Sequence, residues 1–147
     1  MDRQDSQLRV LLVEDSEDDR FFFQHAFNRA ELNARLYIAK DGLEAIEFLK
    51  TEAAVAGGPN FPDVVFLDLK MPELDGFDVL RWMHDQSLLA LMKVYVLSGS
   101  DEPKDIELAK QLGAKKYLVK HVKAQLLRDL LGAPVGSPEH NPQVPKT

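Results

Sequence analysis

Short apolar runs recur along the chain at intervals typical of β-strands. They cover residues 10–13, 36–39, 64–67, 94–97 and 117–119. Each run is continuous rather than alternating, which is the pattern of strands covered on both faces. Segments with helical periodicity lie between and after them, at 16–30, 42–50, 76–86, 103–113 and 122–132. Strand and helix therefore alternate, and the sequence predicts an α/β fold, a doubly wound parallel sheet with helices on both faces.

Local signals mark where several of these helices begin and end. Ser16 is expected to cap the first helix, and Asp19 three residues later comes close to the capping-box pattern. Pro103 suits the first turn of the fourth helix, and Gly113 suits the position just after its end.

Composition limits the function classes. The 147 residues are enough for one domain with an ordinary core. With 18 basic and 24 acidic residues the net charge is −6, which argues against a general nucleic-acid binder. The absence of cysteine excludes disulfides and thiolate metal sites. No apolar run is long enough to span a bilayer, and the polar N-terminus does not resemble a signal peptide, so a soluble, cytoplasmic protein is expected.

The domain limits follow from the same patterns. Residues 8–132 are predicted to form the folded domain, preceded by a flexible N-terminus at 1–7. The stretch 133–147 carries four prolines and no apolar periodicity, which predicts a disordered tail.

Polar residues follow the predicted strands at the point where each strand ends. Glu14 and Asp15 follow the first run, Asp68 the third, Ser98 the fourth and Lys120 the fifth. The carboxyl ends of parallel strands meet at one edge of the sheet, where such folds bind ligands. Taken singly, each residue could be an ordinary helix-start acid, loop serine or solvated lysine. Together they predict a site.

The chemistry of this set indicates phosphoryl transfer. Three adjacent carboxylates repel one another unless a cation is present, and a hard ion with oxygen ligands, above all Mg²⁺, suits them. Lys120 and Ser98 could hold an anion beside the metal. Phosphoryl transfer depends mainly on such positioning and charge neutralisation. Asp68 is then the predicted nucleophile, forming an aspartyl-phosphate.

The sequence resembles the receiver domain of two-component response regulators over residues 8–131. "LLVEDSEDDR", "FLDLKMPELDGFDVL", "VLSGS" and "LGAKKYLVK" resemble the family's four motifs, in the right order and spacing. The resemblance implies a CheY-like, flavodoxin-like (βα)5 fold with strand order 2-1-3-4-5. It also implies two-component signal transduction by a phosphoprotein that is not an enzyme beyond its own phosphorylation and dephosphorylation.

The resemblance implies a role for each matching residue. Asp15 would bind Mg²⁺ directly and Glu14 through water, while Asp68 and the main-chain carbonyl of Lys70 would complete the ligands. Asp68 would accept the phosphoryl group from a histidine kinase.

Further roles concern the phosphoryl oxygens and the switch. Lys120 and Ser98 would hold the oxygens, and Ser98 with Tyr117, the aromatic switch position, would reorganise after phosphorylation. The fourth helix, last strand and last helix would then present the changed surface.

One residue departs from the family pattern. The family has proline in a cis peptide after the lysine, whereas this chain has His121. A cis bond before a non-proline residue costs about 2.5–4 kcal/mol, so a trans peptide and an exposed histidine are expected.

The expected partners are a sensor histidine kinase or histidine phosphotransfer protein and a downstream protein target, with no nucleic acid and no membrane. The architecture, with no output domain expected, resembles small regulators that partner phytochrome-type kinases. A homodimer through the last helices is a hypothesis. The alternative function is a pseudo-receiver, an interaction module that works without phosphate. It is disfavoured because only the proline is missing.

Overall fold

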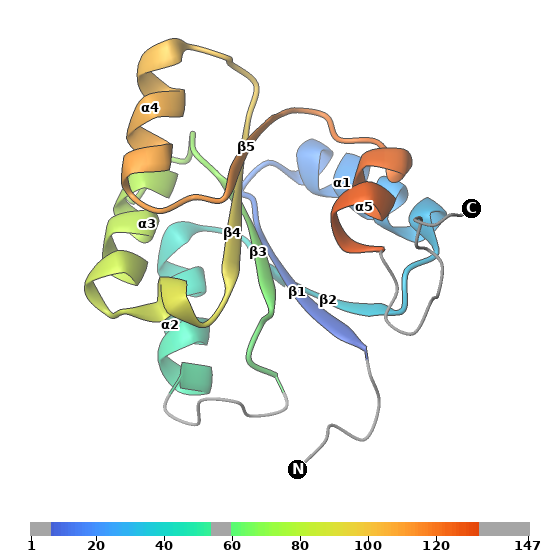
Figure 1. The fold of residues 1–147 in the computed structure, drawn as a ribbon, viewed down its shortest axis with the longest axis horizontal. Coiled ribbons are helices and arrows are strands. Elements are labelled where there is room, and N and C mark those ends of the chain that lie inside the picture. Colours follow the sequence, from blue (N-terminus) through green and yellow to red (C-terminus); the bar gives the residue numbers. More distant parts are fainter. Residues whose placement is uncertain (1–6, 54–59, 133–147) are drawn as a thin grey trace, which may run out of the picture.

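A parallel sheet forms the centre of the protein, seen in a computed structural model that describes residues 7–53 and 60–132. The strand order is β2-β1-β3-β4-β5 (Figure 1). The strands are β1 (Leu8–Val13), β2 (Ala34–Ala39), β3 (Val64–Asp68), β4 (Lys93–Ser98) and β5 (Lys116–Val119). All neighbouring pairs are parallel. The predicted fold class and strand order are therefore confirmed.

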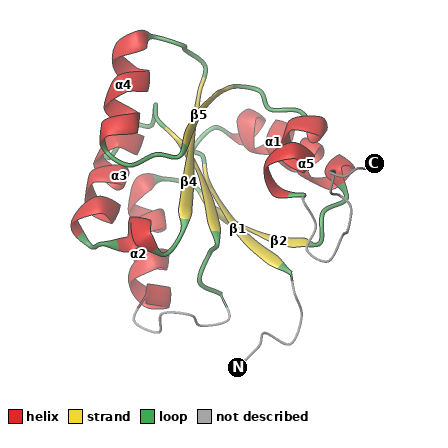
Figure 2. Ribbon diagram, viewed as in Figure 1, coloured by secondary structure: helices red, strands yellow, loops and turns green. Residues whose placement is uncertain are grey.

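Helices cover both faces of this sheet. α1 and α5 pack together on one face, and α2, α3 and α4 lie on the other (Figure 2). The elements are α1 (Glu17–Ala30), α2 (Gly42–Ala53), α3 (Gly76–Asp85), the 3₁₀ helix η1 (Leu88–Ala90), α4 (Pro103–Gln111) and α5 (Ala124–Leu131).

The two faces of the sheet form two separate apolar cores, which explains why the strand sequences are continuously apolar. In β3, Val65 and Leu67 belong to the core under α2 and α3, while Val64 and Phe66 belong to the core under α1 and α5. Because both sets of side chains are buried, no polar residue is favoured within the strand. The first polar residue of β3 is Asp68, at its end.

The helix termini confirm some local predictions and correct others. The Ser16 side chain caps α1 by accepting the Asp19 N–H, but the Asp19 carboxylate completes no capping box because other partners hold it. The reciprocal capping box is instead formed by Asp75 and Asp78 at the start of α3. Gly113 follows α4 with φ 109°, a conformation that favours glycine.

The predicted Pro-rich tail and all but the last residue of the predicted flexible N-terminus lie outside the described residues. The predicted domain limits therefore stay predictions. Within the described ranges, no helix is long and apolar enough to cross a membrane.

Candidate functional site

The carboxyl ends of four neighbouring strands meet at one edge of the sheet. The register pairs Asp68 of β3 with Leu97 of β4, and Ser98 of β4 with Val119 of β5, the residue before Lys120. Glu14 and Asp15 follow β1, which pairs with β3. The structure thus brings the predicted strand-end residues to one edge, as parallel pairing requires.

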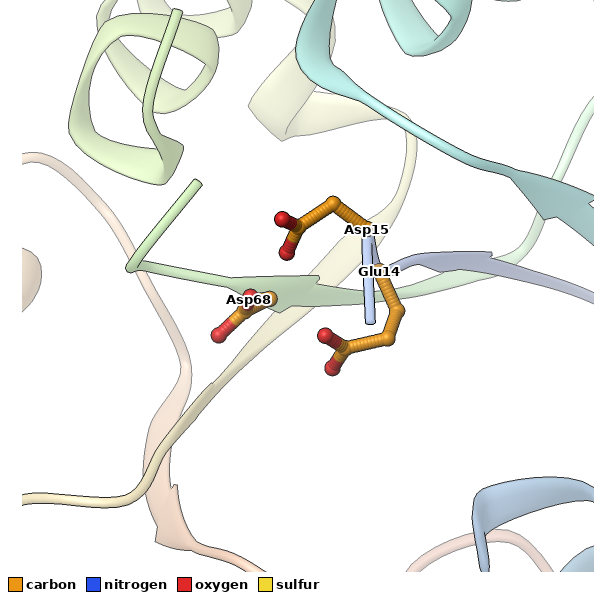
Figure 3. Close-up of side chains that lie close together, drawn as sticks. All are labelled: Glu14, Asp15 and Asp68. Atoms are coloured by element: carbon orange, nitrogen blue, oxygen red, sulfur yellow. The ribbon is translucent and has the colours of Figure 1, made fainter. Parts of the chain in front are cut away.

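Three carboxylates form a cluster there. Glu14, Asp15 and Asp68 each offer an oxygen, and these oxygens lie within 4.8 Å of one another. Figure 3 shows the three carboxyl groups turned to the same side. Glu14 and Asp68 are buried and Asp15 is half-buried. A cluster of oxygen donors with this much negative charge suits a hard divalent cation such as Mg²⁺.

Lys120 places a positive charge among these carboxylates. Its Nζ lies 2.9 Å from Glu14 Oε1, 3.1 Å from Asp68 Oδ1 and 2.7 Å from Asp19 Oδ2. Burial alone would lower the pKa of Lys120, but hydrogen bonds to Asp19 and Glu14 and the charge of Asp68 raise it above its ordinary value. The ammonium is therefore charged throughout the physiological pH range.

The buried carboxylates are not fully compensated by this one cation. Burial raises the pKa of Glu14 from 4.5 to about 7, even though the hydrogen bond from Lys120 lowers it. Burial likewise raises the pKa of Asp68, against the opposing charge of Lys120. These carboxylates thus retain excess negative charge, which a divalent cation would neutralise.

The raised pKa of Glu14 predicts a pH-dependent stability. Between pH 4.5 and about 7 the folded state holds a proton that the unfolded state has lost, so this group's contribution to stability falls as pH rises. Relative to Glu14→Gln, the metal-free wild type should lose on the order of 2 kcal/mol between pH 5 and pH 8. Urea unfolding of both proteins in EDTA measures the difference. Parallel stability curves for the two proteins would contradict the prediction.

Ser98 and Tyr117, the predicted switch residues, are joined through the backbone of one residue, Ser100. The buried Ser98 Oγ accepts the Ser100 N–H at 3.1 Å, and the Tyr117 hydroxyl donates to the Ser100 carbonyl at 2.7 Å. A movement of the Ser98 hydroxyl would therefore disturb the bond that holds Tyr117. Their role in switching stays a prediction.

Lys70 lies beside the acceptor. Its backbone N–H donates to Asp68 Oδ1 at 3.4 Å, while its exposed ammonium pairs with Asp105 at 3.4 Å. The predicted use of its main-chain carbonyl as a metal ligand stays a prediction.

The connection after β5 corrects one expectation about the backbone, and its contacts identify Asp19 as a further residue of the site. The Lys120–His121 peptide is cis, so the predicted trans bond is wrong. The side chains on both sides of this bond are held by one carboxylate, that of Asp19, a contact that local preference cannot anticipate. His121 is exposed, as expected, but its Nε2 lies 2.8 Å from Asp19 Oδ1. Asp19, interpreted from the sequence as a helix-start acid, belongs to the site.

These side chains border an open cavity of about 570 Å³. It is lined by Glu14, Asp15, Ser16, Asp19, Asp68, Lys70, Gly99, Lys120 and His121. A hollow of about 270 Å³ at the opposite end of the strands, beside Leu8 and Ala34, contains none of the predicted site residues.

Comparisons with known proteins agree with this geometry. Residues 10–132 match the family model described as the response regulator receiver domain. The response regulator Rcp1 of Synechocystis sp. is 32% identical over 121 residues, which cover 82% of this chain and 80% of the relative.

Solved structures show the same likeness. The response regulator RPA3017 in red light signaling of R. palustris has a TM-score of 0.73 at 29% identity, with 88% of this chain and 95% of the other covered. The Mn²⁺-bound form of response regulator Rcp1 has a TM-score of 0.67 at 30% identity, with coverages of 84% and 88%.

Proposed function

The chain belongs to the family of response regulator receiver domains, and we propose that it accepts a phosphoryl group on Asp68 from a histidine kinase or histidine phosphotransfer protein. The observation that carries the proposal is the position of the Asp68 carboxylate. It ends a buried strand, borders the open cavity and lies 3.1 Å from the Lys120 ammonium. Receiver domains are signalling proteins of two-component systems, and this chemistry is how such a site would receive its signal.

The transfer step is a substitution at phosphorus. An Oδ oxygen of Asp68 attacks the phosphorus of a phosphohistidine, and the P–N bond breaks with its electron pair staying on the imidazole nitrogen. The product is an acyl phosphate on Asp68. Lys120 stabilises the charge on the phosphoryl oxygens, and the Ser98 hydroxyl donates to one of them after leaving its local bond.

The carboxylate cluster fits a Mg²⁺ ion, which would neutralise charge on the phosphoryl oxygens. Asp15, Asp68 and the main-chain carbonyl of Lys70 would hold the ion directly, and Glu14 would hold it through water. Supporting this assignment, both Glu14 oxygens have partners, Oε1 in Lys120 and Oε2 in the Ser16 N–H, whereas Lys120 and the Lys70 N–H both contact Asp68 through Oδ1.

The partners follow from the same role. We assign phosphorylation to a phytochrome-type or related kinase in the cytoplasm, since a structural neighbour is described as acting in red light signaling. A downstream protein would recognise the surface of α4, β5 and α5 after Ser98 and Tyr117 rearrange. A homodimer through the last helices is testable by sedimentation with and without a phosphate analogue.

The test is intact-mass analysis after incubation with acetyl phosphate and Mg²⁺. We expect one added phosphoryl group that requires metal, is released by hydroxylamine and is absent from Asp68→Asn. Asp101→Asn, which changes an exposed aspartate in the loop after β4, should still be labelled and serves as the matched control. A folded wild type that takes up no phosphoryl group and binds no beryllofluoride would instead indicate a pseudo-receiver.

A further inference from the structure

The Lys120 ammonium has no hydrogen-bond donor left for an incoming group. An ammonium carries three N–H donors, and three carboxylates lie within 3.1 Å of Nζ. The contact with Asp19, at 2.7 Å, is the shortest of the three. A phosphoryl group on Asp68 needs a donor from Lys120, so one existing contact must be given up.

Asp19 is held from two directions. Its backbone N–H is capped by Ser16 at 3.2 Å, which fixes it in the first turn of α1. Its Oδ1 accepts from His121 Nε2 at 2.8 Å, while the His121 ring packs against Phe22 with 4.8 Å between ring centroids. Asp19 therefore bridges the two consecutive residues Lys120 and His121, one with each oxygen.

Asp19 is also the carboxylate that can release Lys120 most easily. Its side chain is 24% exposed, against 2% for Glu14 and for Asp68. It stands outside the three-carboxylate cluster that suits a cation. After releasing Lys120 it keeps both solvent and His121 as partners, whereas Glu14 would be left as a buried charge with less compensation, and Asp68 carries the phosphoryl group itself.

We propose that Asp19 is a displaceable counter-ion of Lys120: it positions the ammonium before phosphorylation and then competes with the phosphoryl group for it. Asp19 is thus a positioning residue that sets how tightly the site retains a phosphoryl group. His121 weakens the hold of Asp19 on Lys120, because it shares the negative charge of the Asp19 carboxylate. This inference rests on the proposed phosphorylation of Asp68. It predicts that removing the Asp19 carboxylate tightens anion binding, whereas a purely supporting residue would have the opposite effect.

Calorimetric titration of beryllofluoride at saturating Mg²⁺ tests the proposal. Asp19→Asn should bind the analogue about fivefold more tightly than the wild type, the gain expected when a partly exposed ion pair no longer competes. Asp18→Asn, which removes the same charge from an exposed position in the same helical turn, is the matched control and should bind nearly as the wild type does.

A change at His121 should act in the opposite direction. His121→Phe keeps an aromatic ring against Phe22 but cannot donate to Asp19, which would then hold Lys120 more firmly. This variant should bind beryllofluoride about threefold more weakly, since Asp19 loses one shared hydrogen bond.

Two outcomes would overturn the inference: weaker binding by Asp19→Asn, or equal affinities for Asp19→Asn and Asp18→Asn. If Asp19→Asn does not fold, Asp19→Ser provides a second neutral variant with a short polar side chain. Failure of the wild type to bind beryllofluoride at all would instead contradict the proposed function, so the two failures are distinguishable.

Discussion

Replacing Lys120 by methionine is expected to slow the phosphorylation of Asp68 by acetyl phosphate about 10²–10³-fold, the loss typical of removing one group that stabilises transition-state charge. The ammonium lies 3.1 Å from Asp68 Oδ1 and is only 12% exposed, so water cannot readily replace it. The rate is measured by intact mass at saturating Mg²⁺. Lys116→Met, at an exposed position in β5, the strand that Lys120 follows, is the matched control.

The same replacement should destabilise the metal-free protein by about 3 kcal/mol at pH 8, because it leaves buried carboxylates without their cation. The hydrogen bond from Lys120 lowers the pKa of Glu14, so its loss moves that pKa further above 4.5. Protonation of Glu14 then relieves the repulsion between the carboxylates, and the stability difference from the wild type should shrink as the pH falls to 5. Urea unfolding in EDTA at both pH values measures this stability difference.

A folded Lys120→Met variant phosphorylated at the wild-type rate would show that phosphorylation does not use the ammonium.

The site residues at the strand ends could be predicted because their placement depends on a short-range sequence pattern and on one rule of topology, the parallel pairing of strands. A continuous apolar run identifies a buried strand, and parallel pairing then brings the residue after each run to a common edge. Asp68, Lys120 and the pair at the end of β1 were found in this way. No knowledge of side-chain packing was needed for that step.

Asp19 was missed because its role depends on contacts between distant segments, and the cis peptide was missed because trans is the default before a non-proline residue. Asp19 has the local pattern of a helix-start acid, but Lys120, 101 positions later, uses its carboxylate. The sequence signal that could have identified Asp19 is its position in the chain, because the first turn of α1 directly follows a strand end that bears site residues.

Gly76→Ala is expected to destabilise the folded protein by about 3 kcal/mol, because the added methyl group cannot be accommodated at the start of α3. A Cβ at Gly76 would lie 2.3 Å from the Asp68 carbonyl oxygen and 2.7 Å from the Leu69 Cα. Both are backbone atoms, so no side chain can rotate away to make room. The Gly76 N–H also donates to the Leu69 carbonyl at 3.1 Å, which ties the helix to the strand end.

The glycine therefore matters to the site as well as to the fold. Separating α3 from β3 would shift the backbone that holds the Asp68 carboxylate against Lys120, so phosphorylation should slow even where Gly76→Ala remains folded. Gly99→Ala is the matched control, because a Cβ there has no atom within 4 Å and should change stability by less than about 0.5 kcal/mol. Urea unfolding compares the two variants. Equal stabilities would mean that β3 and α3 can separate at little cost, and that close backbone packing does not fix the position of Asp68.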